Sequence, residues 1–121
     1  MLDGYMGDRE KLNDKNLVLK NLNELCSLLG MRKLADPQVY FAEGNNKKDP
    51  GGWSGMVIIT ESHISIHTFP KKGFLSADIY SCKNGMDLGL IENYLKVSFG
   101  LKEIEVNFVK RGTKYPIKNI Y

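Results

Sequence analysis

The stretch from residue 54 to 81 constrains the fold most, because it holds three strand-like runs with very short connections. The runs are "SGMVIIT" (54–60), "SHISIHTF" (62–69) and "FLSADIYS" (74–81), and only "PKKG" separates the last two. A parallel crossover needs a dozen or more residues, so these neighbours must pair antiparallel. Two of the runs alternate apolar and polar residues, which predicts a sheet with one buried face.

Two segments with helical spacing of apolar residues flank this block. The first runs from about residue 14 to 29, and the second covers residues 86–99. Capping residues and terminal glycines mark the expected boundaries: Asn13 or Asp14, Gly30 and Gly100. Each segment is long enough to cover part of a small sheet.

Two further short strands are predicted, and together these elements define the fold class. "QVYFAE" (38–43) is the first, and "EIEVNFV" (103–109) is the second, with Ile104, Val106 and Phe108 facing inward. The order of elements predicts one α+β domain over residues 1–121, an antiparallel sheet covered on one face by two helices as a two-layer sandwich. The other face needs a cover, and a second subunit is the simplest one.

The composition is that of an ordinary globular chain of 121 residues, 42% hydrophobic and 26% charged. No apolar run approaches the roughly 20 residues that span a bilayer, so a membrane protein is not expected. The opening residues lack a secretory pattern, and we expect a cytoplasmic protein. A net charge of +3, spread over scattered basic pairs, is too weak a signal to predict nucleic-acid binding.

Two cysteines, Cys26 and Cys82, are both interpreted as thiols, because nothing in the chain suggests an oxidising compartment. Cys26 falls on the apolar stripe of the first helix. A thiol there packs as a small hydrophobic group. Cys82 follows the third strand-like run, so the two cysteines have different settings.

Both histidines of the chain lie in "ESHISIHTF" (61–69). Alternation puts His63 and His67 on the polar face of the strand, opposite Ile64 and Ile66. One interpretation is a solvated strand face without function. A metal site is a second, although four strand residues separate the two imidazoles by about 13 Å, too far for one ion.

A third interpretation is backbone chemistry at Ser62. A serine hydroxyl can attack the carbonyl before it, turning the amide into an ester, if the peptide is strained and the oxyanion is stabilised. Elimination and hydrolysis then leave a pyruvoyl group, which forms a Schiff base with a substrate amine and withdraws electrons as pyridoxal does. Because a Glu-Ser dipeptide is common, spacing alone does not choose among the three interpretations.

A family resemblance favours the third. "GMVIITESHISIHTFPKKGFLSADIYSCK" (55–83) resembles the core of the prokaryotic S-adenosylmethionine decarboxylase proenzymes, with their ESH-x-x-x-HT-aromatic-P motif followed by a strand ending in D-hydrophobic-aromatic-S/T-C. "LDGYMGDREKLND" (2–14) and "LKEIEVNFVKRG" (101–112) resemble the opening and closing strands of that family. The resemblance implies self-cleavage between Glu61 and Ser62 into fragments 1–61 and 62–121, with the pyruvoyl cofactor made from Ser62.

The resemblance also implies roles for four other residues. His67 matches the histidine needed for processing, and Ser54 matches the hydroxyl that assists it. Cys82 matches the proton donor in decarboxylation. Phe69 matches the aromatic residue that stacks on the purine of the substrate. No metal is implied.

Two departures from the family pattern concern the substrate and the first strand. The family usually has a glutamate after the proline, where it holds the ribose hydroxyls, but here Lys71 is followed by Lys72. A lysine cannot accept hydrogen bonds from a diol, so this departure bears on nucleoside specificity. The opening strand, with only Met1 to Tyr5 before the polar turn, is also shorter than in the family.

The resemblance implies a pyruvoyl-dependent enzyme that converts S-adenosylmethionine to the aminopropyl donor for spermidine, working as a homodimer of processed protomers with sites near the interface. One alternative is a relative that decarboxylates arginine or ornithine, in keeping with Lys71. Another is an unprocessed paralogue that acts as a binding or regulatory subunit.

Overall fold

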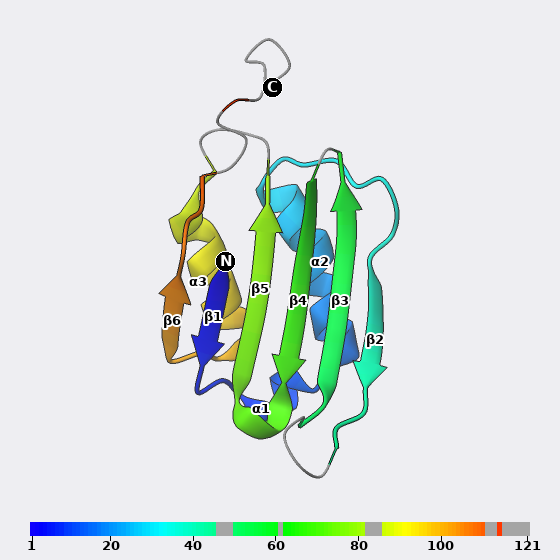
Figure 1. Ribbon diagram of the computed structural model, residues 1–121, viewed down its shortest axis with the longest axis vertical. Helices are drawn as coiled ribbons and strands as arrows, with labels where there is room; N and C mark the ends of the chain where they lie inside the picture. Colours follow the sequence, from blue (N-terminus) through cyan, green and yellow to red (C-terminus); the bar gives the residue numbers. More distant parts are fainter. Residues whose placement is uncertain (46–49, 61, 82–85, 111–113, 115–121) are drawn as a thin grey trace.

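Six strands form one antiparallel sheet in the order β2-β3-β4-β5-β1-β6 (Figure 1). The computed structural model describes residues 1–45, 50–60, 62–81, 86–110 and 114. The strands are β1 (Leu2–Tyr5), β2 (Gln38–Ala42), β3 (Gly52–Ile59), β4 (Ser62–Phe69), β5 (Phe74–Tyr80) and β6 (Glu103–Val106). The helices are α1 (Arg9–Leu12), α2 (Lys15–Leu28) and α3 (Leu88–Phe99), with a short 3-10 turn, η1 (Pro70–Lys72), between β4 and β5.

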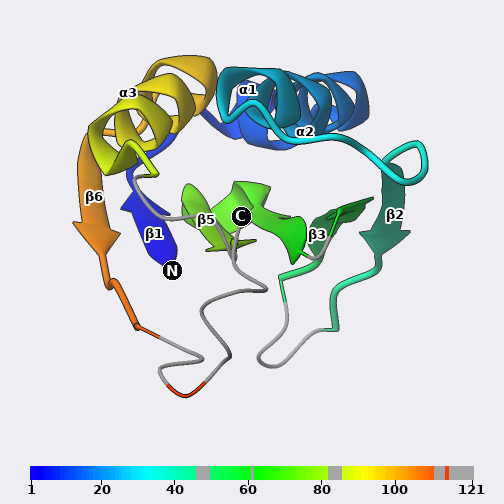
Figure 2. The same cartoon turned by 90° about the horizontal axis from the view of Figure 1, so that it is seen from above.

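Figure 2 shows the helices on one face of the sheet, as the α+β prediction requires. A core between the two layers joins Leu22 and Leu25 of α2, Ile64 and Ile66 of β4, and Phe99 of α3, all without exposed surface. Burying one such side chain contributes roughly 1.5–3 kcal/mol, so these residues fix which face of β4 meets the helices. No helix in the described ranges has the length and apolar character needed to cross a membrane.

Helix α2 begins and ends where its capping residues predict, whereas α3 ends before Gly100 as predicted but begins at Leu88, after the cap Asp87, and not at residue 86. Asp14, rather than Asn13, caps α2, because its carboxylate accepts a hydrogen bond from the Leu17 N–H at 3.1 Å. Gly30, with φ +63°, follows the end of α2 in the left-handed region. Gly100 adopts the same conformation after α3.

The expectation of only two helices is wrong, since α1 adds a third. Asp8 caps it by accepting hydrogen bonds from the N–H groups of Glu10 and Lys11. One turn is too short to show helical periodicity, and Leu12 is the only one of its residues that is buried.

The last strand is shorter than the expected range of 103–109 and ends at Val106. Ile104 packs against the core, but Phe108 lies beyond the strand and is 66% exposed. Val106 is also exposed, because β6 pairs only with β1 and forms an edge of the sheet. Val106 nevertheless shares the face of Ile104, since it pairs with the buried Leu2, so the predicted inward placement is wrong only for Phe108.

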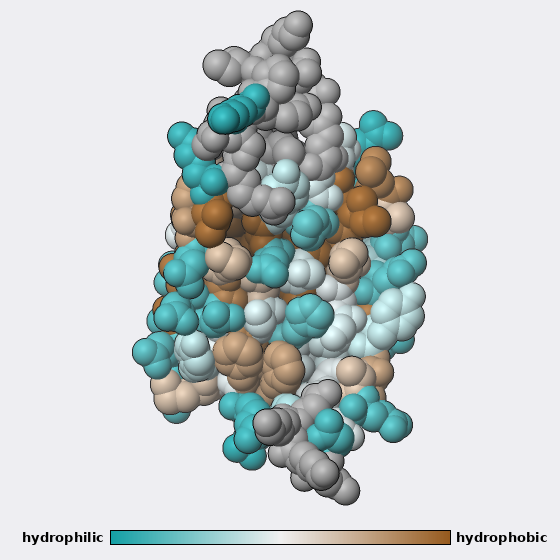
Figure 3. All heavy atoms as spheres, in the orientation of Figure 1, coloured by the Kyte–Doolittle hydropathy of each residue, from teal (hydrophilic) through white to brown (hydrophobic). Residues whose placement is uncertain are grey.

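The face of the sheet opposite the helices, here called the outer face, mixes polar and apolar side chains (Figure 3). Its exposed apolar residues include Tyr40 of β2 and Met56 and Ile58 of β3, which are 65%, 48% and 51% exposed. Register places them together, because Tyr40 pairs with Ser54 and alternation along β3 carries that face to Met56 and Ile58.

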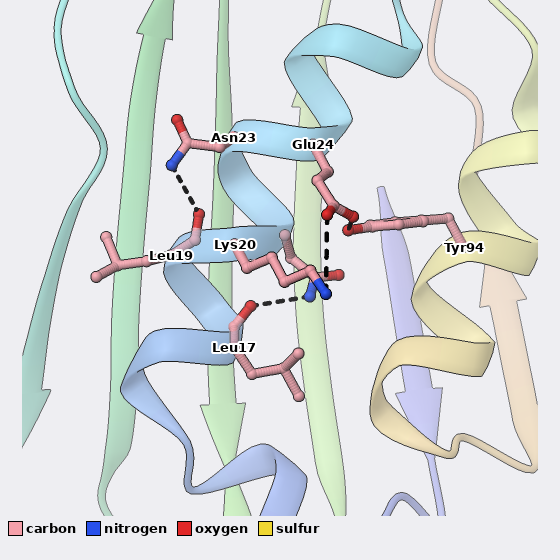
Figure 4. Close-up of polar contacts among 7 residues, drawn as sticks. Leu17, Leu19, Lys20, Asn23, Glu24 and Tyr94 are labelled. Carbon is pink, nitrogen blue, oxygen red and sulfur yellow. Dashed lines mark hydrogen bonds and ion pairs between the residues drawn. The ribbon is translucent and has the colours of Figure 1, made fainter.

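The two long helices are joined by a polar contact between Tyr94 of α3 and Glu24 of α2 (Figure 4). The Tyr94 hydroxyl donates to the Glu24 carboxylate, which also forms an ion pair with Lys20 at 3.8 Å. Burial and, after it, the hydrogen bond to Glu24 raise the pKa of Tyr94. The neutral phenol is therefore the form that the folded protein favours.

Replacing Gly52 by alanine is expected to destabilise the fold by more than about 2 kcal/mol. Gly52 has φ +152°, and a Cβ there would lie 1.8 Å from the Thr68 carbonyl oxygen. Gly89→Ala is the matched control, since Gly89 is in α3 and a Cβ there would make only an ordinary contact. Alanine should raise the free energy of unfolding there by up to about 1 kcal/mol. Urea unfolding of both variants tests this, and equal stabilities would contradict it.

The Tyr94 hydrogen bond is expected to make stability depend on pH in the alkaline range. Because the folded pKa is raised above the ordinary value of 10.0, the stabilisation is complete below pH 10 and is lost as the pH rises further. Urea unfolding is measured between pH 8 and 11.5. At pH 8 the free energy of unfolding of wild type should exceed that of Tyr94→Phe, and this difference should shrink above pH 10. A difference that stays constant over this range would refute the assignment.

Candidate functional site

Strand β4 carries the candidate site, and its alternation is as predicted. Ile64 and Ile66 are fully buried under the helices. His63 and His67 lie on the outer face, where His67 is exposed and His63 half-buried. Ser65, between them, is 9% exposed. The two imidazoles therefore share one face, four residues apart.

Ser54 and His67, predicted to act in processing, are brought together by the pairing of β3 with β4. The two residues are register partners, and His67 Nδ1 lies 2.8 Å from Ser54 Oγ. In one tautomer the Ser54 hydroxyl donates to Nδ1, and in the other Nδ1–H donates to Oγ. The first arrangement leaves Nε2–H as a proton donor, and the second leaves Nε2 as a base.

Ser62 occupies the first position of β4 and pairs with Ile59, the last residue of β3. Only residues 60 and 61 connect the two strands. A break before Ser62 would therefore cut the covalent connection between β3 and β4 without removing any residue pair of their ladder. The half-buried Ser62 is thus at a position where the backbone can be cut while the sheet stays paired.

The Ser54–His67 pair is not close to Ser62 of the same chain. Five residues of extended strand separate Ser62 from His67, which amounts to roughly 16 Å. Alternation also places the Ser62 side chain on the helix side, with Ile64, while His67 is on the outer face. Direct proton transfer needs donor and acceptor about 3 Å apart, so the pair cannot serve this serine within one protomer.

Phe69 belongs to a row of three aromatic residues that crosses β4, β5 and β1. Its ring centroid lies 5.4 Å from that of Phe74, which lies 5.4 Å from that of Tyr5. The ring planes are tilted by 41° and 48° to their neighbours, so each ring offers its own apolar face on which a planar group can stack. Sequence reasoning found only Phe69, although the alternation of β5 from Phe74 onward was the signal that could have added the second ring.

A second ring contact joins His63 to Tyr80 of β5, another residue that sequence reasoning missed. The ring centroids are 5.5 Å apart, with 32° between the ring planes. The two residues are also register partners, and no β4–β5 pair closer to Ser62 is found among the described residues. This contact therefore lies one residue from the predicted cleavage point.

Charges of opposite sign occupy different parts of this region. Lys71 and Lys72 are exposed in η1, which directly follows Phe69. Acidic residues lie on β1 and β6, where the Tyr5 hydroxyl donates to Glu105 at 3.1 Å. That hydrogen bond is the main cause that raises the pKa of Tyr5, which keeps the phenol protonated beside Phe74.

Glu61 and Cys82 lie outside the described residues, so the roles expected for them stay predictions. Cys26 is buried on α2, and burial raises the pKa of its thiol, although Lys33 partly opposes this. Such a thiol is a poor nucleophile, in keeping with a packing role. Within the described ranges, no cluster of three or more His, Cys, Asp or Glu residues is arranged to hold a metal ion.

Comparison with solved structures supports the fold. The chain resembles the crystal structure of the adenosylmethionine decarboxylase from Aquifex aeolicus VF5 with a TM-score of 0.70. The match covers 93% of this chain and 91% of the other, at 22% sequence identity. At that identity the likeness speaks for the architecture of the sheet and its helices.

Comparison by sequence identifies the family. The S-adenosylmethionine decarboxylase proenzyme of Pyrococcus furiosus is 42% identical over 105 residues, 87% of this chain and 70% of that protein. The proenzyme of the same name from Clostridium botulinum strain Langeland is 31% identical over 112 residues, 93% of this chain and 90% of the other. The family model described as S-adenosylmethionine decarboxylase matches residues 1–112. With its β4 motif and this fold, the chain belongs to the S-adenosylmethionine decarboxylase family.

Proposed function

We propose that this protein is a self-processing, pyruvoyl-dependent decarboxylase that acts on S-adenosylmethionine and supplies the aminopropyl donor for spermidine. The observation that carries the proposal is Ser62 at the first position of β4, with the hydrogen-bonded Ser54–His67 pair at the other end of the β3–β4 ladder. Membership of the family supports it, because the similar proteins are named as proenzymes. The cytoplasmic location expected from the sequence stays a prediction.

The residues around Ser62 fit the formation of a pyruvoyl group from that serine. Every β3–β4 residue pair from Ser54–His67 to Ile59–Ser62 joins one fragment to the other, so a new chain end can form while β4 stays paired in the sheet. A pyruvoyl group supplies an electrophilic carbonyl that withdraws electrons from a breaking bond. The thiol of Cys82 is proposed to return a proton to the substrate, and Phe69 to hold its purine.

The geometry supports a site that two protomers build together. The Ser54–His67 pair lies roughly 16 Å along the strand from its own Ser62, and Phe69 lies roughly 23 Å away. A two-fold axis perpendicular to β4 near Ser65 would bring His67 of the partner subunit to the backbone at Ser62. By symmetry, His67 of this chain would reach the same position in the partner subunit. The backbone lies in the plane of the sheet, so its peptide is accessible from the outer face.

The outer face has the apolar residues that such packing needs. Tyr40, Met56 and Ile58 are about half or more exposed, although they sit on a sheet whose opposite face is already covered by helices. Exposed apolar groups gathered on one face are typical of interaction surfaces. We therefore propose a homodimer in which the two outer faces pack together.

Ser62→Ala is expected to abolish self-cleavage and decarboxylation while the fold remains, because it removes only the attacking hydroxyl. Mass spectrometry of denatured wild type should give fragments 1–61 and 62–121, the second lighter than simple hydrolysis predicts by one molecule of ammonia. The variant should give one uncut chain. Retained CO2 release by Ser62→Ala would exclude the pyruvoyl mechanism.

The substrate is checked on the same preparation by CO2 release from S-adenosylmethionine, arginine and ornithine. Release from S-adenosylmethionine is expected, because its purine can stack on the ring of Phe69, whereas arginine and ornithine have no ring system. Release from arginine or ornithine alone would instead assign Lys71 to a changed specificity. Uncut and inactive wild type would favour a regulatory paralogue.

A shared site predicts that one inactive variant can restore the cleavage of another. In a mixed dimer, the Ser62→Ala chain still has the Ser54–His67 pair, and the His67→Ala chain still has Ser62. The proposed geometry places that pair at that serine. Co-expression should therefore let up to about half of the His67→Ala chains be cut, as random pairing allows. The readout is fragment mass, with one chain carrying an affinity tag.

The matched control is co-expression of Ser54→Ala with His67→Ala. Each chain then lacks one member of the pair that its partner needs, so no cleavage is expected beyond that of either variant alone. Equal cleavage in both mixtures, or none in the first, would show that the site is not shared in this way. Size-exclusion chromatography of each mixture verifies that dimers have formed.

A further inference from the structure

The stack of His63 on Tyr80 lies beside the point where the chain is proposed to be cut. Ring centroids 5.5 Å apart and planes tilted by 32° are typical of a favourable aromatic pair. His63 is bonded directly to Ser62, and Tyr80 is the last residue of β5. The contact therefore ties the beginning of β4 to the end of β5.

Cleavage before Ser62 poses a mechanical problem that the uncut chain does not have. Before the cut, the backbone holds the beginning of β4 from both directions. After it, residue 62 becomes a chain end, and chain ends fray unless other contacts hold them. A reacting group must stay within about half an ångström of its productive position, so fraying there reduces turnover.

We propose that Tyr80 is a positioning residue that holds the new chain end through His63. This inference rests on the proposed self-cleavage, and it assigns Tyr80 a role that begins only once the chain is cut. Tyr80 contacts the imidazole of His63, which is bonded to residue 62, and does not act on the substrate. The stacking energy resists the rotation that would lift residues 62 and 63 from the sheet.

The neighbours of His63 on the other side support a fixed ring position. On β3, His63 pairs with Ile58, whose side chain belongs to the same outer face. The imidazole thus lies between an aliphatic group and an aromatic ring on the two adjacent strands.

The experiment compares Tyr80→Ala with Tyr80→Phe, which keeps the ring and removes only the hydroxyl. Self-cleavage is followed by fragment mass, and the mobility of residues 63–66 is followed by amide hydrogen exchange with mass spectrometry. Both are measured on cleaved protein and on uncut protein made in the Ser62→Ala background. Turnover of the cleaved enzyme is measured as CO2 release.

Tyr80→Ala protein should cleave itself at close to the wild-type rate. Before cleavage, its amide hydrogen exchange should be nearly that of wild type. Once cleaved, it should lose about tenfold in amide protection over residues 63–66 and lose turnover in parallel, whereas Tyr80→Phe should retain both. Equal loss of protection in uncut and cleaved protein would overturn the inference, since it would indicate a general structural role. Unchanged protection and turnover in cleaved Tyr80→Ala would overturn it as well.

Failure of this inference is distinguishable from failure of the proposed function. If wild-type protein is never cut, the self-processing mechanism itself fails. If wild type is cut and active while Tyr80→Ala behaves identically, only the role of Tyr80 fails. Should Tyr80→Ala fold poorly, the more conservative His63→Phe keeps a ring in the stack and is expected to preserve protection after cleavage.

Discussion

The pairing of β4 with β3 and β5 is the constraint on which the rest of the molecule depends. Because strand side chains alternate, this register decides at once that Ile64 and Ile66 face the helices and that both histidines face outward. A shift of one residue would bury the imidazoles and expose the isoleucines. The same register sets Ser54 opposite His67, so the polar pair depends on the packing of the core.

Local patterns in the sequence were sufficient to predict the order of elements and most of their boundaries. The caps at Asp14 and Gly100 act within one helical turn, and the alternation in β4 is visible in eight residues. These signals depend only on neighbouring residues, which explains why they survive without knowledge of the fold. The one-turn helix after Asp8 was missed because a single turn carries no periodicity.

The candidate site was predictable as a set of residues but not as an arrangement. Motif resemblance named Ser54, Ser62 and His67, and only the paired strands show that two of the three meet while the third is far along the strand. The partners of Phe69 and His63 were missed for the same reason, since cross-strand contacts join residues that are distant in sequence. The edge position of β6 likewise depends on the whole sheet, and alternation alone misplaced Phe108.

The strand order has a consequence for the proposed cut between residues 61 and 62. The fragment that ends at residue 61 supplies β1, β2 and β3, and the fragment that begins at Ser62 supplies β4, β5 and β6. Since β1 lies between β5 and β6, and β3 lies against β4, the two pieces are interlocked along three separate ladders. Dissociation would require extracting an interior strand, so a cut at the proposed point would leave two pieces that remain together for as long as the sheet stays folded.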